Sequence, residues 1–218
     1  MADKKNDDPP RTSGSGEQAV DFTDDSIPAD ARTAIVRLLE EIGYLRSEIE
    51  ANNQRIEELE NLADRDPLTP VVNRRAFVRE LERVKAYGER YGNAASLIYL
   101  DLNGMKAIND QFGHAAGDQV LLSVAEALVA NVRSSDLVGR LGGDEFGIIL
   151  ARADRKAAEE KAAILLRLAE KLEVTCNGNT IPVSLAYGIV DLEAHQNAEA
   201  ALAAADRAMY ERKKARDT

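Results

Sequence analysis

The 218-residue sequence lacks tryptophan and contains only one cysteine, Cys176. A single cysteine cannot form an intrachain disulfide, and this composition fits a reducing compartment. No apolar run approaches the roughly 18 residues that a membrane-spanning helix requires, and no segment typical of a secretory signal peptide opens the chain. One cysteine and two histidines are also too few for a convincing transition-metal cluster. The sequence therefore predicts a soluble, cytoplasmic protein.

The sequence also has no excess of basic residues over acidic ones. Lysine and arginine number 28 against 38 aspartates and glutamates, which gives a net charge of −10. Residues 1–30 contain three of the basic and eight of the acidic residues, so half of the net charge lies there. Residues 31–218 are only mildly acidic, which argues against nucleic acid as a partner. The 44% hydrophobic content indicates a globular protein.

Residues 1–28 are rich in aspartate, proline, serine and glycine. Such a segment cannot bury enough apolar surface to offset the entropy lost on ordering, so we predict a disordered acidic tail. The patch Ala19-Val20-Asp21-Phe22 could dock an unknown protein partner, although a passive solubilising tail is the favoured interpretation.

Residues 29–63 follow a heptad repeat. Isoleucine recurs at every first position and leucine at three of the four fourth positions, with Asn52 at the other. The repeat consists of Ile35, Leu38, Ile42, Leu45, Ile49, Asn52, Ile56 and Leu59. Isoleucine at a and leucine at d favour a parallel two-stranded coiled coil. The alternative is an amphipathic helix that packs on its own domain.

The charges beside the repeat agree with a parallel dimer. In that arrangement Glu41 faces Arg46 of the partner subunit, and Arg55 faces Glu60 of the partner subunit, so both pairs have opposite sign. Asn52 would lower stability but fix the register. A parallel stalk would hold two copies of residues 64–218 side by side.

Residues 64–218 show the pattern of a mixed domain. Pro67 and Pro70 end the stalk helix. The order predicted after them is helix, strand, helix, hairpin, helix, strand, helix, which indicates an α+β, ferredoxin-like fold. The helices are expected at 74–91, after Asp118 with Leu121, Val124, Leu128 and Val132 buried, at 155–172 and at 197–214; the strands at 96–100 and 183–190; the hairpins around Gly142 and at Asn177-Gly178.

The turn Gly142-Gly143-Asp144-Glu145 has two adjacent carboxylates at its tip. Glycine would supply the positive φ of a tight hairpin, but the two negative charges repel each other unless a cation lies over them. A solvated acidic turn is the simpler interpretation. Asp101, however, ends a buried strand that could meet the tip at one edge of the sheet, and such carboxylates suit Mg²⁺. Gly104 would let the backbone approach phosphates, which predicts metal-assisted phosphoryl chemistry on a nucleotide.

Several separated motifs resemble one family. They are Leu68-Thr69 with Asn73-Arg74-Arg75, the stretch 101–118, the stretch 142–146, and Ala205-Asp206 with Met209-Tyr210 and Lys213. Together they resemble the GGDEF family of diguanylate cyclases over about residues 64–215, because several motifs in order are far more specific than one. The resemblance implies a domain related to class III nucleotide cyclases and polymerase palms.

The resemblance also implies site residues. Asp101, the Leu102 carbonyl and Asp144 would hold Mg²⁺, with Mn²⁺ as an alternative. Asp144 and Glu145 would be the catalytic residues. Asp144 is the first candidate for the base, and Glu145 is either a catalytic acid/base partner or a supporting carboxylate, so which of the two acts as base stays open. The substrate-binding residues would be Gly104, Met105, Lys106 and Lys213 at the triphosphate, Asn109 and Asp118 at guanine, and His114, Gly142 and Gly143 nearby. A carboxylate at Asp118 can accept from both donors on the guanine edge, which favours GTP over ATP. For His114 a structural role at the start of a helix is an equal alternative.

The family reaction joins two GTP into cyclic di-GMP, a bacterial second messenger, and releases two pyrophosphates at the interface of two domains. The resemblance thus implies a homodimer held by the coiled coil.

Arg133 and Asp136 have the spacing of the family's product-inhibition site, where cyclic di-GMP binds. Pro70 departs from the usual glycine in the turn that joins the stalk to the domain. Arg216-Asp217 depart from the usual pattern near the end, which leaves the second phosphate-binding arginine open, with Arg216 as one candidate. The alternative function is an inactive receptor that binds cyclic di-GMP or GTP and signals through its stalk.

Overall fold

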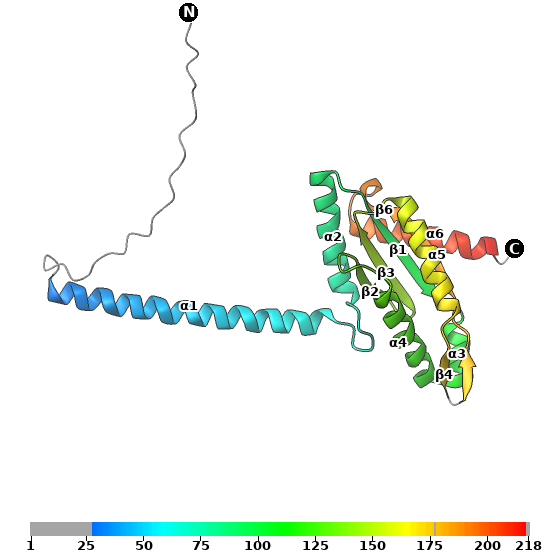
Figure 1. Ribbon diagram of the computed structural model, residues 1–218, viewed down its shortest axis with the longest axis horizontal. Coiled ribbons are helices and arrows are strands. Elements are labelled where there is room, and N and C mark those ends of the chain that lie inside the picture. Colours follow the sequence, from blue (N-terminus) through cyan, green and yellow to red (C-terminus); the bar gives the residue numbers. More distant parts are fainter. Residues whose placement is uncertain (1–27, 177, 217–218) are drawn as a thin grey trace, which may run out of the picture. The chain divides into compact units, whose positions relative to one another are not determined.

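The computed structural model describes residues 28–176 and 178–216 (Figure 1). The predicted disordered tail, apart from Pro28, lies outside these residues. The chain divides into two compact units, Met1–Ile56 and Glu57–Thr218, which are described separately. No helix in the described ranges combines the length and the apolar character that a membrane crossing requires.

The first unit contains most of helix α1, Ala29–Asp64, in the place where the heptad repeat predicts a helix. Large apolar side chains along it are exposed in the single chain. Leu38, Ile42, Leu45 and Ile49 have between 44% and 59% of their surface accessible. All four occupy a or d positions of the repeat, so the predicted seam is uncovered in one copy.

The second unit is built on a four-stranded antiparallel sheet with strand order β2-β3-β1-β6. Its strands are β1 (Ala95–Leu102), β2 (Leu137–Arg140), β3 (Glu145–Ala151) and β6 (Leu185–Asp191). The helices are α2 (Arg74–Tyr91), α3 (Met105–Phe112), α4 (His114–Ala130), α5 (Arg155–Glu170) and α6 (Ala198–Arg216), with a 3-10 turn η1 (Leu192–Ala194). A separate hairpin pairs β4 (Val174–Cys176) with β5 (Asn179–Ile181).

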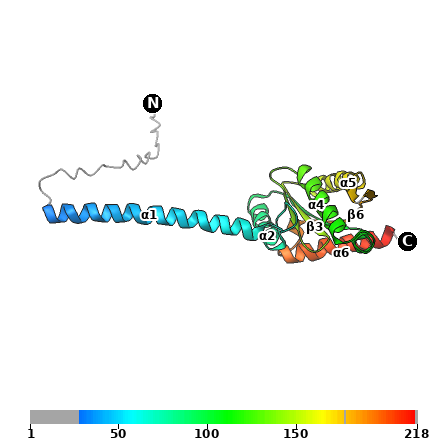
Figure 2. The same cartoon turned by 90° about the horizontal axis from the view of Figure 1, so that it is seen from below.

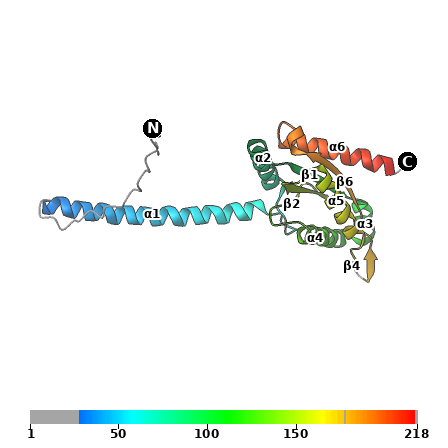
Figure 3. The same ribbon diagram turned by 45° about the horizontal axis from the view of Figure 1, so that its top comes forward.

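Helices cover both faces of this sheet, as Figures 2 and 3 show. Alternate residues of β1 point to opposite faces. Leu97 and Tyr99 pack with side chains of α2 and α6, whereas Ile98 and Leu100 pack with side chains of α4 and α5. The α+β fold class predicted from the order of elements is therefore confirmed.

The helix expected after Asp118 begins earlier, at His114, and a separate helix α3 precedes it. Gly113 divides the two because its φ of 84° lies in the left-handed region. Val132, predicted on the buried face of the helix, follows its end at Ala130 and packs against the core from the next turn. The last strand starts at Leu185 rather than Val183.

The packing of α6 on β6 is unusually close. A Cβ at Gly188 would lie 2.0 Å from the Ala205 carbonyl oxygen, so glycine is required for this approach. The close contact fixes α6 across the sheet and brings its last turns toward the carboxyl end of β1, where Lys213 reaches Asp101.

Candidate active site

The acidic hairpin tip lies against the end of β1. Asp101 is paired with Glu145 in the β1–β3 register, and the Leu102 N–H donates to the Asp144 carbonyl at 3.1 Å. The antiparallel pairing thus brings Asp101 and Asp144 to the same end of two adjacent strands. The predicted juxtaposition of these two carboxylate residues at one edge is confirmed.

Lys213 supplies a positive charge at this edge. Its Nζ lies 2.5 Å from Asp101 Oδ1, and the Asp101 side chain is largely buried. Because Lys213 lies on α6 and Asp101 on β1, the ion pair joins two elements far apart in the sequence. This pairing offsets part of the cost of placing a carboxylate at the end of an apolar strand.

Glu145 is held in place by its neighbours. The Tyr99 hydroxyl hydrogen-bonds its carboxylate, and burial, with the charge of Glu145 added, raises the pKa of Tyr99 above its usual range. Glu145 also lies over Gly142, since a Cβ at Gly142 would be 2.2 Å from Glu145 Oε2. Within the described ranges, no hydrogen bond or ion pair involves the Asp144 carboxylate, so Asp144 is the more available ligand.

The glycines of the hairpin tip do not supply the positive φ that was predicted from the sequence. Neither Gly142 nor Gly143 has a positive φ, so that prediction is wrong. The four-residue connection between β2 and β3 is long enough to reverse the chain without a left-handed residue. Gly142 is needed instead because any side chain would displace Glu145, whereas a Cβ at Gly143 would meet nothing within 4 Å.

Arg140 holds the hairpin tip by hydrogen bonds to Gly143 and Asp66, a role that the sequence did not predict. Its Nη2 and Nε donate to the Gly143 carbonyl at 2.7 and 3.2 Å, and its Nη1 donates to Asp66 Oδ1 at 3.2 Å. The same Asp66 oxygen accepts from the backbone N–H groups of Leu68 and Thr69 and from the Thr69 hydroxyl. The Leu68-Thr69 motif and the hairpin tip are therefore one connected network.

The carboxylate of Asp66 is stabilised in its charged form. Burial raises its pKa, but the hydrogen bonds from Thr69 and Arg140 outweigh burial and hold the pKa below its usual range. Asp66 therefore remains ionised and paired with Arg140 at neutral pH.

The backbone after β1 forms an anion-binding geometry. Gly104 has a φ of 75° and precedes helix α3, so the first N–H groups of that helix are not used inside it. Met105 is buried and anchors this turn, while Lys106 is exposed beside it. Within the part of the chain that the structure describes, this turn thus has amide donors without a backbone partner and a cation nearby, a combination that suits phosphate binding.

The residues predicted to read guanine lie on α3 and α4. Asn109 is on α3, and a Cβ at Gly117 of α4 would be only 2.0 Å from Asn109 Oδ1. Gly117 therefore makes room for the Asn109 side chain, which the sequence reasoning did not identify. Asp118 follows Gly117 and is exposed, and His114 is exposed as the first residue of α4.

The donor set at the sheet edge fits Mg²⁺ or Mn²⁺. Asp101 and Asp144 supply carboxylate oxygens and Leu102 a carbonyl, which are the hard ligands that these ions prefer, with phosphate and water completing the shell. Among the residues described, no group of three histidines, cysteines, aspartates or glutamates could hold an ion alone.

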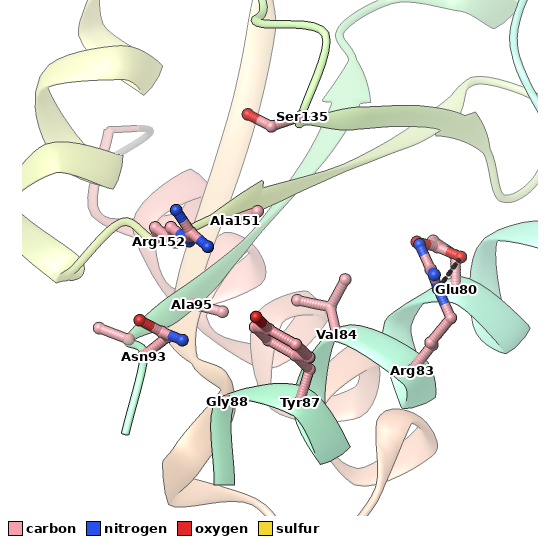
Figure 4. Close-up of a pocket in the computed structure, with 11 residues that line it drawn as sticks. Glu80, Arg83, Val84, Tyr87, Gly88, Asn93, Ala95, Ser135, Ala151 and Arg152 are labelled. Atoms are coloured by element: carbon pink, nitrogen blue, oxygen red, sulfur yellow. Dashed lines mark hydrogen bonds and ion pairs between the residues drawn. The ribbon is translucent and has the colours of Figure 1, made fainter. Parts of the chain in front are cut away.

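Arg133 and Asp136 form a tight turn before β2. The Asp136 carboxylate accepts from the Arg133 N–H at 3.0 Å and from the Ser135 hydroxyl at 3.3 Å. The Arg133 side chain is exposed. Ser135 also lines a cavity of about 240 Å³ together with Arg83, Arg152, Glu80 and Tyr87 (Figure 4).

Comparison with known proteins agrees with these features. Residues 63–218 match the family model described as "Diguanylate cyclase, GGDEF domain". The diguanylate cyclase DosC of Escherichia coli K12 is 37% identical over 146 residues, which cover 66% of this chain and 32% of DosC. The chain thus spans about a third of the length of that relative.

Two solved structures are similar over most of the chain. The coiled coil and GGDEF domain of DgcB from Caulobacter crescentus, in complex with c-di-GMP, matches with a TM-score of 0.71 and 24% identity, over 82% of this chain and 95% of that one. Diguanylate cyclase SiaD from Pseudomonas aeruginosa, in complex with its activator SiaC, matches with a TM-score of 0.67 and 27% identity, over 84% and 73%. The first likeness supports the fold alone.

Proposed function

This chain belongs to the diguanylate cyclase GGDEF domain family, and on that premise we propose that it condenses two GTP molecules into cyclic di-GMP and two pyrophosphates. The observation that carries the proposal is the Leu102–Asp144 hydrogen bond, which places Asp144 beside Asp101 at the end of β1. A family member without the reaction would not need two carboxylate residues at an apolar sheet edge, where they are costly.

Asp101, the Leu102 carbonyl and Asp144 would hold Mg²⁺, with Mn²⁺ as the alternative. When bound, such an ion would offset phosphate charge and favour loss of the proton from the attacking 3′-hydroxyl. Asp144 would accept that proton, because its carboxylate is available, whereas Glu145 is engaged with Tyr99. Glu145 would support the tip.

The triphosphate would lie over the backbone of Gly104 and Met105, between Lys106 and Lys213. Exposed N–H groups at the start of α3 favour this position. Asp118 would accept from the two donors on the guanine edge and Asn109 would hydrogen-bond the same base, with His114 beside them and Gly142 and Gly143 lining the tip. Adenine lacks the donor pair that Asp118 would bind, so GTP is the expected substrate.

Each domain would contribute one loaded half of the site, so two copies must meet. The uncovered seam of Leu38, Ile42, Leu45 and Ile49 supports a parallel coiled-coil dimer over residues 29–63. Tethering turns the encounter of two loaded domains into an intramolecular step. Residues 64–218 would then be the catalytic domain.

Cyclic di-GMP would inhibit the reaction by binding at Arg133 and Asp136. Asp136 is occupied within its own turn, which leaves the exposed Arg133 guanidinium as the principal contact for phosphate or guanine. Arg133→Ala should raise the cyclic di-GMP concentration that halves the rate by about tenfold, since a charged hydrogen bond is lost. An unchanged inhibition curve would refute this site.

The proposed reaction is tested by incubating purified protein, stripped of bound nucleotide, with GTP and Mg²⁺. Chromatography should show cyclic di-GMP and pyrophosphate in a ratio of one to two, and the same incubation with ATP should give no cyclic dinucleotide. Tight GTP or cyclic di-GMP binding without any product would instead identify the chain as a receptor that signals through its stalk.

A further inference from the structure

A second cavity lies beside the phosphate-binding turn. It has a volume of about 360 Å³ and is bounded by the edge strand β6, the turn after β1 and the last turns of α6. Its lining residues are Asn103, Ser184, Leu185, Ala186, Tyr187, Arg212 and Lys213. Among the residues that the structure describes, two adjacent cations and no acidic residue line it, so its chemistry favours an anion.

Arg212 is the least satisfied side chain of this cavity. Its guanidinium lies over the Tyr187 ring, 4.3 Å from the ring centroid, and this stacking fixes the plane of the group. Its Nη1 is buried and, among the residues that the structure describes, has no hydrogen-bond partner. The nearest acidic contact is Nη2 to Glu159 Oε1 at 4.0 Å, the outer limit for an ion pair. A buried N–H donor without an acceptor is costly, so the geometry calls for one.

The cavity adjoins the residues assigned to GTP. Lys213 lines it and also reaches Asp101. Asn103 stands in the sequence between Leu102 and Gly104, and its N–H and side-chain amide hold Ser184 through bonds of 2.9 and 3.1 Å to the carbonyl and hydroxyl oxygens. An anion in the cavity would therefore lie next to the phosphate-binding backbone of Gly104.

We propose that Arg212 is a further phosphate-binding residue, which contacts the β- and γ-phosphates of GTP from this cavity together with Lys213. The assignment rests on the proposed function. A planar guanidinium can donate to two phosphate oxygens at once, and Arg212 lines the cavity beside Lys213. Arg212 thus supplies the second arginine that the sequence left open, from a position four residues before Arg216. The same contacts would stabilise the leaving pyrophosphate.

The test compares two nucleotides that differ in the β- and γ-phosphates. The full-length protein is titrated calorimetrically, with Mg²⁺, with GMP and with the α,β-methylene analogue of GTP, which cannot be cleaved at that bridge. Arg212→Gln should weaken binding of the triphosphate analogue about tenfold or more, the loss expected for a charged hydrogen bond, and change GMP binding less than twofold. Arg212→Lys should recover part of the loss, because the charge remains.

Lys214→Gln is the matched control, since it also removes one positive charge, two positions further along α6 and outside the cavity. It should leave both affinities unchanged. Equal weakening of GMP and analogue by Arg212→Gln, or no weakening, would overturn the assignment while leaving the proposed function intact. If the wild-type protein bound neither nucleotide, both proposals would fail together.

Discussion

Asp144 and Glu145 are neighbours in the chain but have different surroundings. Glu145 accepts from Tyr99 and fills the space over Gly142, whereas Asp144 has its backbone paired with Leu102 and its carboxylate available. Two adjacent carboxylates can therefore serve two purposes, one binding a cation and one supporting the tip.

This difference predicts unequal effects of substitution. Asp144→Asn should reduce turnover by about 10²–10⁴-fold, the range for loss of a positioned acid/base group, because the proposed metal ligand and the proposed base are lost together. Glu145→Gln should cost about tenfold or less, since the amide oxygen can still accept from Tyr99. Steady-state rates of cyclic di-GMP formation measure both, and a larger loss for Glu145→Gln would reverse the assigned roles.

Alanine substitutions at Gly142 and Gly143 form a second pair of variants with different expected effects. Gly142→Ala should reduce turnover by about 10²-fold, because its Cβ forces Glu145 away from Tyr99 and a small misplacement in an active site can cost that much. Gly143→Ala should be nearly silent, since its Cβ would enter open space. Thermal unfolding of both variants shows whether folding is retained. Equal rates for the two alanine variants would contradict the packing explanation.

The sequence predicted which residues meet at this site better than how they do so. The position of Asp101 at the end of a buried strand and of Asp144 in a hairpin was enough to place them together. The steric reasons for Gly142 and Gly117 could not be predicted, because each depends on a side chain brought close by tertiary packing.

The β2–β3 hairpin is stabilised from outside its own sequence. Arg140 joins the Gly143 carbonyl to Asp66, which organises the turn between α1 and α2. The tip that carries Asp144 is thus fixed by the segment that follows the stalk helix. A change in that segment would alter the tip through Arg140.

Asp66→Asn tests this network through pH. The pKa of Asp66 is lowered on folding, so its charge stabilises the fold above the unfolded pKa of about 4, and that contribution is lost as the pH falls through the folded value. The variant should lose about 1 kcal/mol of unfolding free energy at pH 7, the difference between charged and neutral hydrogen bonds. Its stability should also fall less steeply below pH 4.

Urea unfolding at several pH values measures both effects. Glu126→Gln, an exposed change on α4, is the control and should match the wild type. Identical acid dependence of wild type and Asp66→Asn would show that Asp66 is not a stabilising charge.

Most elements were predictable because their apolar residues follow a clear period. Helix α2 and strand β1 lie where 74–91 and 96–100 were expected. Helix α3 was not predicted because only Met105 of its eight residues is buried, so it has no apolar stripe of its own. Its start depends on the left-handed Gly104 and its end on Gly113.

At the scale of the whole molecule, we propose that the stalk provides the second copy of the domain that the reaction needs. The seam residues are exposed in one chain, and the heptad pattern predicts that a parallel partner covers them. Ile42→Glu with Leu45→Glu should convert the dimer to a monomer in light scattering, because charges would be buried at a and d positions. Ser47→Glu, at the outer f position, should leave the dimer intact.

The most direct measurement of the central claim is the initial rate of cyclic di-GMP formation against protein concentration for this double variant. If the active site forms only when two GTP-loaded domains meet, the rate should rise with the square of the concentration, whereas the tethered wild type should show a linear rise. A double variant that is monomeric, linear in concentration and as active per chain as the wild type would contradict the claim.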